Sequence, residues 1–178
     1  MDALRDRIPD YARDLRLNLS SVLTPQGAPG LSEAQLWMTA LASAIASRNA
    51  ELARAIEAAA TGKLEPVQAE AARAAAAIMG MNNVYYRFLH LVEDDEYAKL
   101  PARLRMNVIG SPGIDKADFE LMSLAVSAVN GCGKCVSSHE RILRQHNLGR
   151  EAVQSAVRIA SVIHAVAGVL DYETARAA

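Results

Sequence analysis

The hydrophobic positions of the chain follow a helical spacing rather than that of β-strands. Near the N-terminus, Tyr11, Leu15 and Leu19 stand four residues apart, which places them on one face of an α-helix. No segment shows a clear alternation of β-branched and polar residues, the pattern that is typical of a strand. With 34 alanines in 178 residues, the chain is also rich in the strongest helix former. The sequence therefore predicts an all-α protein, built as a multi-helix bundle.

Residues that favour helix ends divide the chain into segments. Ser32 and Gln35 have the spacing of a capping box, while Pro66 and Asp115 favour a first turn and an N-cap. Two prolines and two glycines make the stretch 99–114 irregular. We expect helices from Pro9 to the TPQGAPG stretch, over 33–47, from Asn49 to about Gly62, over 66–91, from Asp115 to about Asn130, over 132–146 and from Gly149 to about Thr174.

The chain also echoes itself weakly when it is shifted by about 85 residues. The shift superposes Leu36 on Leu121, Ala71 on Ala156, Ala75 on Ala160, Ile78 on Ile163 and Val84 on Val169. An alanine-rich chain also produces such matches by chance, because a shift of 51 residues pairs Gly80 with Gly131 and Ala77 with Ala128. We expect a single domain over residues 1–178 with an internal two-fold helical repeat, whose halves span about 1–92 and 93–178.

Charge and composition narrow the functional classes. The 19 lysines and arginines are scattered among 20 aspartates and glutamates, and aromatic residues make up 4% of the chain. A basic stripe with interleaved aromatics is typical of nucleic-acid binding, and since the chain has no such stripe we exclude that function. No apolar run reaches about 18 residues without a charge, and the charged N-terminus lacks the apolar stretch of a signal peptide. We therefore expect a soluble, cytoplasmic protein that binds no membrane.

The two cysteines, Cys132 and Cys135, are separated by two residues, with His139 one helical turn further on. On a helix these three side chains fall within about 60° of one another. Two cysteines are too few for a disulfide scaffold, so they suggest redox or metal chemistry. Cys132 stands at the predicted helix start, where free N–H groups and the helix dipole favour a thiolate, and Lys134 adds positive charge. The spacing of His139 from Cys135 lets the imidazole act as a base for the sulfur.

A polar stripe follows the preceding predicted helix, which is otherwise almost wholly apolar. It consists of Glu120, Ser123, Ser127 and Asn130. A carboxylate in such surroundings costs several kcal/mol unless it is paired or protonated, and His139 is the candidate partner. The alternative is that the stripe is the solvated edge of a surface helix.

The spacing of four residues resembles a known signature: Glu120 is followed after eleven residues by Cys132-x-x-Cys135, and His139 follows after three more. This pattern resembles the E-x11-C-x-x-C-x3-H signature of the alkylhydroperoxidase D proteins, within the carboxymuconolactone decarboxylase-like family. The resemblance extends to four further segments and covers most of the chain: YARDLRLNLSSVL, QLWMTALASAIASRN, IMGMNNVYYR and LRMNVIGSPGIDKADFEL. It implies an all-helical fold with an internal helical repeat, usually assembled as a homotrimer. The sequence departs from the best-known members at Lys134, where they carry a histidine. A proton-shuttle role at this position is therefore in doubt, while the cationic effect on a thiolate would survive.

The resemblance also implies a function. It indicates an antioxidant oxidoreductase, an alkyl hydroperoxide reductase whose Cys132 and Cys135 cycle between dithiol and disulfide. Alkyl hydroperoxides are the implied substrates, with hydrogen peroxide and peroxynitrite as further ones. No cofactor is tightly bound and no metal is used. Dihydrolipoamide, or the lipoyl group of a 2-oxoacid dehydrogenase component, is the implied electron donor, and a peroxiredoxin is a further partner.

Four residues are expected to be catalytic: Glu120, Cys132, Cys135 and His139. Peroxide reduction needs a thiolate, a general acid for the leaving alkoxide and a second thiol that resolves the sulfenic acid. We assign Cys135 as the thiolate, activated by His139 and Glu120, and Cys132 as the resolving and more exposed thiol. The reverse order is open, because the helix terminus favours a thiolate at Cys132.

Two other functions fit parts of the pattern. A closed zinc site would need both cysteines, His139 and Glu120 as ligands, because the chain has no second cysteine pair. A non-peroxidatic member of the same decarboxylase-like family, or a stress-response interaction protein on the same scaffold, is the second alternative. The intact CxxC disfavours a decarboxylase, whose chemistry does not depend on a redox dithiol.

The remaining histidines and a second polar cluster are assigned structural roles. We expect surface, helix-end or core positions for His90, His146 and His164. We expect packing within the bundle or at a subunit interface for Met79, Met81, Asn82, Asn83, Tyr85 and Tyr86. The alternative for the asparagines and tyrosines of this cluster is that they line the access route to the site.

Overall fold

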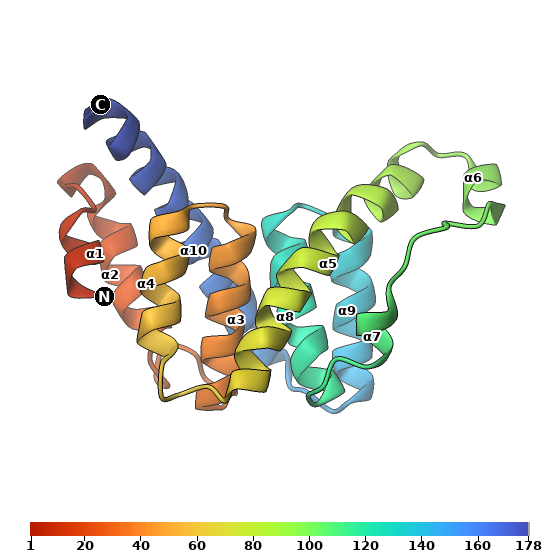
Figure 1. Ribbon diagram of the computed structural model, residues 1–178, viewed down its shortest axis with the longest axis horizontal. Coiled ribbons are helices and arrows are strands. Elements are labelled where there is room, and N and C mark those ends of the chain that lie inside the picture. The colour runs from red at the N-terminus through yellow and green to blue at the C-terminus, as the bar shows by residue number, and fades with distance from the viewer. Residues whose placement is uncertain (178) are drawn as a thin grey trace.

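The computed structural model describes residues 1–177. Within these residues the regular structure is helical, apart from one isolated bridge between Thr61 and Leu64 (Figure 1). The elements are α1 (Asp2–Asp6), the 3-10 turn η1 (Asp10–Ala12), α2 (Arg13–Val22), α3 (Glu33–Ala46), α4 (Ala50–Ala60), α5 (Pro66–Leu91), α6 (Asp95–Lys99), α7 (Asn107–Gly110), α8 (Lys116–Val129), α9 (Gly133–Gln145) and α10 (Arg150–Ala177). The predicted all-α class is confirmed.

The residues that were expected to start helices do so. The hydroxyl of Ser32 accepts a hydrogen bond from the backbone N–H of Gln35 at 3.1 Å, and the Ser32 N–H donates to the Gln35 side chain at 3.0 Å. This capping box satisfies two backbone donors at the start of α3. Asp115 caps α8 by accepting from the N–H of Ala117 at 2.8 Å. Pro66 occupies the first turn of α5, where its missing N–H has no helical partner to lose.

The N-terminal segment differs from the prediction, because Pro9 does not open an α-helix. The chain leaves α1 at Asp6, Pro9 precedes η1, and α2 begins only at Arg13. Proline disfavours the helical conformation at the residue before it, so the chain is broken between α1 and η1. The stretch expected to be irregular, 99–114, includes the single turn α7.

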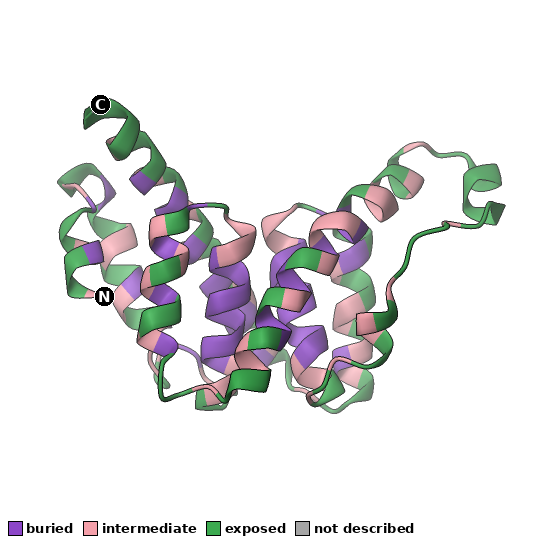
Figure 2. Ribbon diagram, in the orientation of Figure 1, coloured by how far each residue is buried: buried purple, intermediate pink, exposed green. Residues whose placement is uncertain are grey.

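The core forms around α3, which packs against α4, α5, α8 and α10 (Figure 1). Buried positions concentrate on α3 and α8, as Figure 2 shows. Ala40 and Ala44 of α3 and Ala72 and Ala75 of α5 are fully buried. Small side chains let helix axes approach closely, so α5 lies tightly against the centre of the bundle. The helices α5, α8 and α9 pack on one another and position the site described below.

The last helix, α10, is long and apolar enough to cross a membrane by length and composition alone. Half of its most apolar stretch is buried inside the bundle. Ile159, Ile163 and Val166 are fully buried, and the helix packs against α2, α3 and α8. A core helix passes the same test of length and composition, and these contacts account for the apolar face of α10.

A protruding arm, residues 84–105, consists of the end of α5, the helix α6 and the segment that returns towards α7 (Figures 1 and 2). Glu93, between α5 and α6, and Arg103, in the returning segment, adopt left-handed φ angles of 54° and 53°. Six large hydrophobic side chains of the arm are exposed: Val84, Phe88, Leu91, Tyr97, Leu100 and Leu104. Among these six, the rings of Phe88 and Tyr97 contact each other edge to face, with their centroids 5.3 Å apart.

Candidate active site

The CxxC pair lies at the start of α9, where Cys132 directly precedes the first helical residue and Cys135 lies in the first turn. Gly131 adopts a φ of 68°, a left-handed value that favours glycine, and it turns the chain from α8 into α9. Cys132 is the N-cap, and its Sγ accepts a hydrogen bond from the backbone N–H of Cys135 at 3.3 Å. The two cysteines form a disulfide with their Cα atoms 5.3 Å apart. The sulfur of Cys132 thus occupies the end of the helix that stabilises a negative charge.

The predicted contact between Glu120 and His139 is confirmed. The Nδ1 atom of His139 lies 2.6 Å from Oε2 of Glu120. Glu120 is 2% exposed, so the alternative of a solvated helix edge is wrong. The stripe is instead the contact face of α8, where Ser123 and Ser127 are also fully buried. Because α8 and α9 pack side by side, the carboxylate on one helix orients the imidazole on the other.

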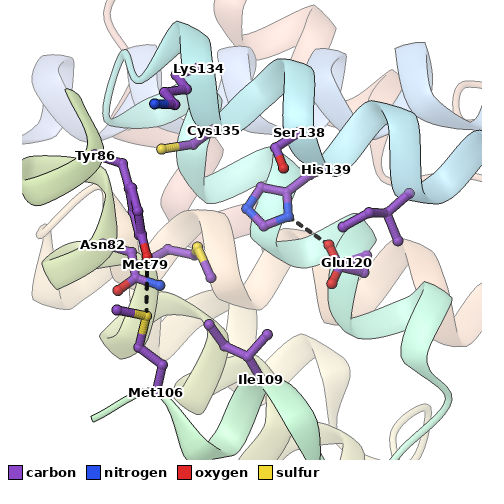
Figure 3. A pocket seen from close by; sticks show the side chains of 11 residues that line it. Met79, Asn82, Tyr86, Met106, Ile109, Glu120, Lys134, Cys135, Ser138 and His139 are labelled. Carbon is purple, nitrogen blue, oxygen red and sulfur yellow. Dashed lines mark hydrogen bonds and ion pairs between the residues drawn. The ribbon is translucent and has the colours of Figure 1, made fainter. Parts of the chain in front are cut away.

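A cavity of about 360 Å³ joins these groups (Figure 3). Its lining comes from three helices, the turn α7 and the residue before α7: Met79, Asn82 and Tyr86 on α5; Met106 and Ile109; Glu120 on α8; and Lys134, Cys135, Ser138, His139 and Ile142 on α9. Figure 3 shows α5 forming one wall while Cys135 and His139 project from α9 on the other. The sulfur of Cys135, the imidazole of His139 and a largely apolar surface therefore share one space.

The expected order of exposure of the two cysteines is wrong. Cys132, expected to be the more exposed thiol, is fully buried, whereas Cys135 is 6% exposed and lines the cavity. The N-cap position explains this result, because the Cys132 side chain folds back over the first turn of α9 to accept its hydrogen bond. Lys134, also in the first turn, is exposed and lies at the cavity rim.

The two neighbouring asparagines of α5 face different surroundings. Asn83 donates to the Ser127 hydroxyl at 2.8 Å and accepts from the Asn130 amide at 2.9 Å. Arg87 donates to the Asn130 carbonyl at 2.7 Å, so this network ties α5 to the end of α8 just before the CxxC. Asn82, by contrast, lines the cavity with Tyr86, which is compatible with the alternative that these residues line the access route.

Several lining residues were not identified from the sequence. Ser138 and Ile142 follow Cys135 by three and seven residues, so helical periodicity could have found them. Met106 and Ile109 come from the stretch that was expected to be irregular, where no periodicity indicates which side chains face inward. These residues approach the site only because the segment after the arm folds back onto α9.

The other three histidines lie apart from this cavity, and the zinc alternative can be compared with the side chains around it. His90, His146 and His164 are exposed and are not among its lining residues. Across residues 1–177, no group of three His, Cys, Asp or Glu side chains is arranged to hold a metal ion. The zinc alternative, which needs four such ligands, therefore gains no support.

A buried Glu–His pair beside a CxxC at a helix N-terminus, in an all-helical bundle, defines a helical dithiol oxidoreductase. Residues 95–175 match the model of the carboxymuconolactone decarboxylase family. The chain is 59% identical over 171 residues to the alkyl hydroperoxide reductase AhpD of Gluconacetobacter diazotrophicus, covering 96% of this chain and 92% of the relative.

Two further relatives carry the same name. AhpD of Rhodospirillum centenum is 57% identical over 175 residues, which is 98% of this chain and 92% of the relative. AhpD of Streptomyces avermitilis is 55% identical over 173 residues, which is 97% of this chain and 96% of the relative. The chain therefore belongs to the AhpD family of alkyl hydroperoxide reductases, as the signature around the CxxC predicts.

Proposed function

We propose that this protein is an antioxidant dithiol peroxidase that reduces alkyl hydroperoxides with Cys132 and Cys135. The observation that carries the proposal is the common cavity onto which Cys135 and the Glu120-bound His139 open. The disulfide between the cysteines is the oxidised product that such a cycle leaves behind. The names of the relatives support the same activity.

In the first step, the thiol of Cys135 gives its proton to His139, and Glu120 stabilises the resulting imidazolium. The thiolate attacks the terminal oxygen of the hydroperoxide, so that an S–O bond forms and the O–O bond breaks. The alkoxide takes the proton from His139 and leaves as an alcohol. Cys135 is then a sulfenic acid, oxidised by two electrons.

In the second step, Cys132 resolves the sulfenic acid. Its sulfur attacks the sulfur of Cys135, the S–S bond forms, and the S–O bond breaks. The departing hydroxide takes the thiol proton and leaves as water. The apolar cavity wall favours organic hydroperoxides over hydrogen peroxide, since only the former have an alkyl group to bury there.

The burial of the sulfurs bears on the electron donor. A reducing thiolate reaches the disulfide through the cavity and attacks Cys135, because Cys132 is fully buried. Cys132 then leaves as a thiolate at the helix N-terminus, where the N–H of Cys135 stabilises it. A slender dithiol such as dihydrolipoamide, free or on the lipoyl arm of a 2-oxoacid dehydrogenase component, fits this route. A peroxiredoxin as a second acceptor of these electrons extends the same proposal.

The arm supports self-association. Its exposed hydrophobic side chains on α5 and α6 suit a contact with further copies of the chain, and a homotrimer is the assembly that we propose. A cytoplasmic location, where a CxxC can be kept reduced between turnovers, completes the proposal.

The test is hydroperoxide consumption with dihydrolipoamide as electron donor. Thioredoxin and glutathione, each with its reductase, serve as alternative donors, and tert-butyl hydroperoxide and hydrogen peroxide serve as alternative substrates. We expect turnover with dihydrolipoamide and a higher kcat/KM for the organic hydroperoxide. The absence of turnover with all three donors, in protein whose two thiols titrate as reduced, would refute the proposed function.

A further inference from the structure

Asn82 contains a buried polar group that the bundle leaves unsatisfied. The residue is 4% exposed, and its Oδ1 has no hydrogen-bond partner within residues 1–177. Asn83, with the same chemistry one position along, is fully committed to Ser127 and Asn130. Buried amides are usually hydrogen-bonded, and those that are not call for a functional explanation.

Three other buried side-chain oxygens lack a partner in this part of the chain: Thr39 Oγ1, Ser43 Oγ and Ser123 Oγ. All three are hydroxyls in helix interiors, where rotation about χ1 can bring the group to the carbonyl of the preceding turn. None of them lines the cavity. Asn82 differs from this group, because its unsatisfied Oδ1 is an acceptor and the backbone N–H groups in mid-helix are already bonded to carbonyls of the preceding turn.

The surroundings of Asn82 indicate its partner. The residue lines the cavity from α5, on the wall facing Cys135 and His139 (Figure 3). On the α5 wall the other polar side chain is that of Tyr86, whose hydroxyl contacts the sulfur of Met106 at 3.7 Å, while across the cavity Glu120 pairs with His139. Lys134 and Ser138, which line the cavity from α9, are exposed to solvent. The Asn82 amide is therefore the polar group of this wall that is available to a ligand.

We infer that the Asn82 amide binds the O–O–H group of the hydroperoxide and holds its terminal oxygen towards Cys135. A hydroperoxide has one O–H donor and two acceptor oxygens, and an amide offers one acceptor and an NH₂ donor. The terminal torsion of asparagine is soft, so either end can turn to the bound group. Met79, Met106, Ile109 and Ile142 surround the alkyl part. The inference rests on the proposed peroxidase function and assigns the residue that recognises its substrate.

The closing experiment compares Asn82→Leu with wild type in two reactions of the reduced protein. Leucine keeps the approximate size of asparagine and removes both polar ends. We expect the second-order rate constant for oxidation by tert-butyl hydroperoxide and by hydrogen peroxide to fall about ten-fold, the value of one lost hydrogen bond in this range. Alkylation by iodoacetamide, which reports the thiolate and has no O–O–H group, should keep its wild-type rate.

Two control variants separate substrate binding from structure. Asn83→Ala should lower the thermal unfolding midpoint, whereas Asn82→Leu should not, because it removes an unsatisfied group. Ile109→Ala should slow oxidation by the organic hydroperoxide and spare hydrogen peroxide, whereas Asn82→Leu should slow both. Three results would each overturn the inference. Asn82→Leu could slow oxidation and alkylation equally, it could oxidise at the wild-type rate, or its unfolding midpoint could fall as far as that of Asn83→Ala. An inactive wild type would instead refute the proposed function.

Discussion

His139 and Glu120 lie on adjacent antiparallel helices with their side-chain atoms Nδ1 and Oε2 2.6 Å apart. The carboxylate is 3% exposed and the imidazole 12%, so water screens the pair only weakly. An N–H at Nδ1 donates to the carboxylate, which leaves Nε2 without a partner from Glu120. In the proposed mechanism Nε2 exchanges the proton, and the pair acts as one unit that sets the proton state near Cys135.

The first prediction concerns this unit. Glu120→Gln and His139→Ala should each lower kcat by about 10²- to 10⁴-fold, the usual effect of removing a positioned acid or base. The double variant should lose little more than the worse single variant, because either change disables the same unit. Steady-state peroxidase assays test this, with the exposed pair Glu151→Gln and His146→Ala as controls. Additive losses would show that the two side chains act independently.

The second prediction concerns the order of the cysteines. Because Cys135 lines the cavity and Cys132 is buried, Cys132→Ser should still reduce one equivalent of hydroperoxide. Cys135 should then accumulate as a sulfenic acid that dimedone traps and mass spectrometry locates. Cys135→Ser should consume none. Trapping at Cys132 in the Cys135→Ser variant would instead establish the reverse order, with the helix terminus as the activator.

Much of this site could be predicted from the sequence, because its chemistry depends on short helical spacings. Caps and periodicity placed Cys132, Cys135 and His139 on one face and brought Glu120 to His139. The approach of Met106, from a segment without periodicity, depends on longer-range packing and could not be predicted. The different surroundings of Asn82 and Asn83 could not be predicted either, because the local sequence pattern does not distinguish these two neighbouring asparagines.

The internal repeat stays a prediction, and the helix register supports it. The helix α8 begins 83 residues after α3, α9 begins 83 after α4, and α10 begins 84 after α5. Arg48, with a φ of 63°, precedes the N-cap of α4 as Gly131, with a φ of 68°, precedes that of α9. The two N-caps also make the same contact: the Asn49 side chain accepts from the N–H of Leu52 at 2.7 Å, and the Cys132 sulfur accepts from the N–H of Cys135 at 3.3 Å.

The repeat would also explain why only the second half carries the chemistry. At the offset of 83 residues, Trp37 corresponds to Glu120 and Ile56 corresponds to His139. Both counterparts are buried hydrophobic residues. On this interpretation the first half retains the capped-helix geometry and uses it for packing, while the second half uses it for redox chemistry.

The third prediction concerns the arm. Leu91→Glu, and separately Phe88→Asp, should shift the protein from a trimer to a monomer in sedimentation at micromolar concentration. A charge in a desolvated apolar contact is unfavourable, whereas on an exposed helix it is tolerated. Leu17→Glu, at a side chain that is exposed on α2 away from the arm, is the matched control and should keep the wild-type mass. A monomeric mass for the wild-type protein would contradict the proposal that the arm mediates self-association.

The fourth prediction concerns Asp118 and the dependence of stability on pH. Burial raises the pKa of this carboxyl, a hydrogen bond from Gln35 at 2.7 Å partly offsets that effect, and the nearby charge of Asp115 adds to it. A carboxyl whose folded pKa is raised stabilises the fold below its unfolded pKa of about 3.9, and this contribution is lost as pH rises through the folded pKa.

Asp118→Asn should therefore unfold at a higher temperature than wild type at neutral pH, and the difference should vanish as the pH falls below about 4. Asparagine keeps an oxygen that can accept from Gln35, so the contact between α3 and α8 is retained. Calorimetry between acid and neutral pH measures the effect. The exposed control Asp14→Asn should follow the wild-type curve, and a constant difference at all pH values would mean that charge is not the cause.

The last prediction concerns Lys134, whose position is unfavourable for the helix itself. A cation in the first turn of α9 opposes the helix dipole, at a cost of about 0.3–1 kcal/mol. Lys134→Ala should therefore raise the unfolding midpoint slightly. The same change removes a positive charge from the cavity rim, so the fraction of thiolate at Cys135 should fall and alkylation by iodoacetamide should slow by a few-fold. Lys134→Arg should behave as wild type, and Lys134→Glu should slow alkylation further.

Salt separates this electrostatic effect from a change in packing. Because Lys134 is exposed, its interaction with the thiolate should be screened, and the alkylation rates of wild type and Lys134→Ala should converge at high ionic strength. The difference in alkylation rate between wild type and His139→Ala should change less with salt, since the His139 side chain is only 12% exposed. A difference between wild type and Lys134→Ala that persists unchanged at high salt would show that the lysine acts through direct contact in the cavity rather than through its charge.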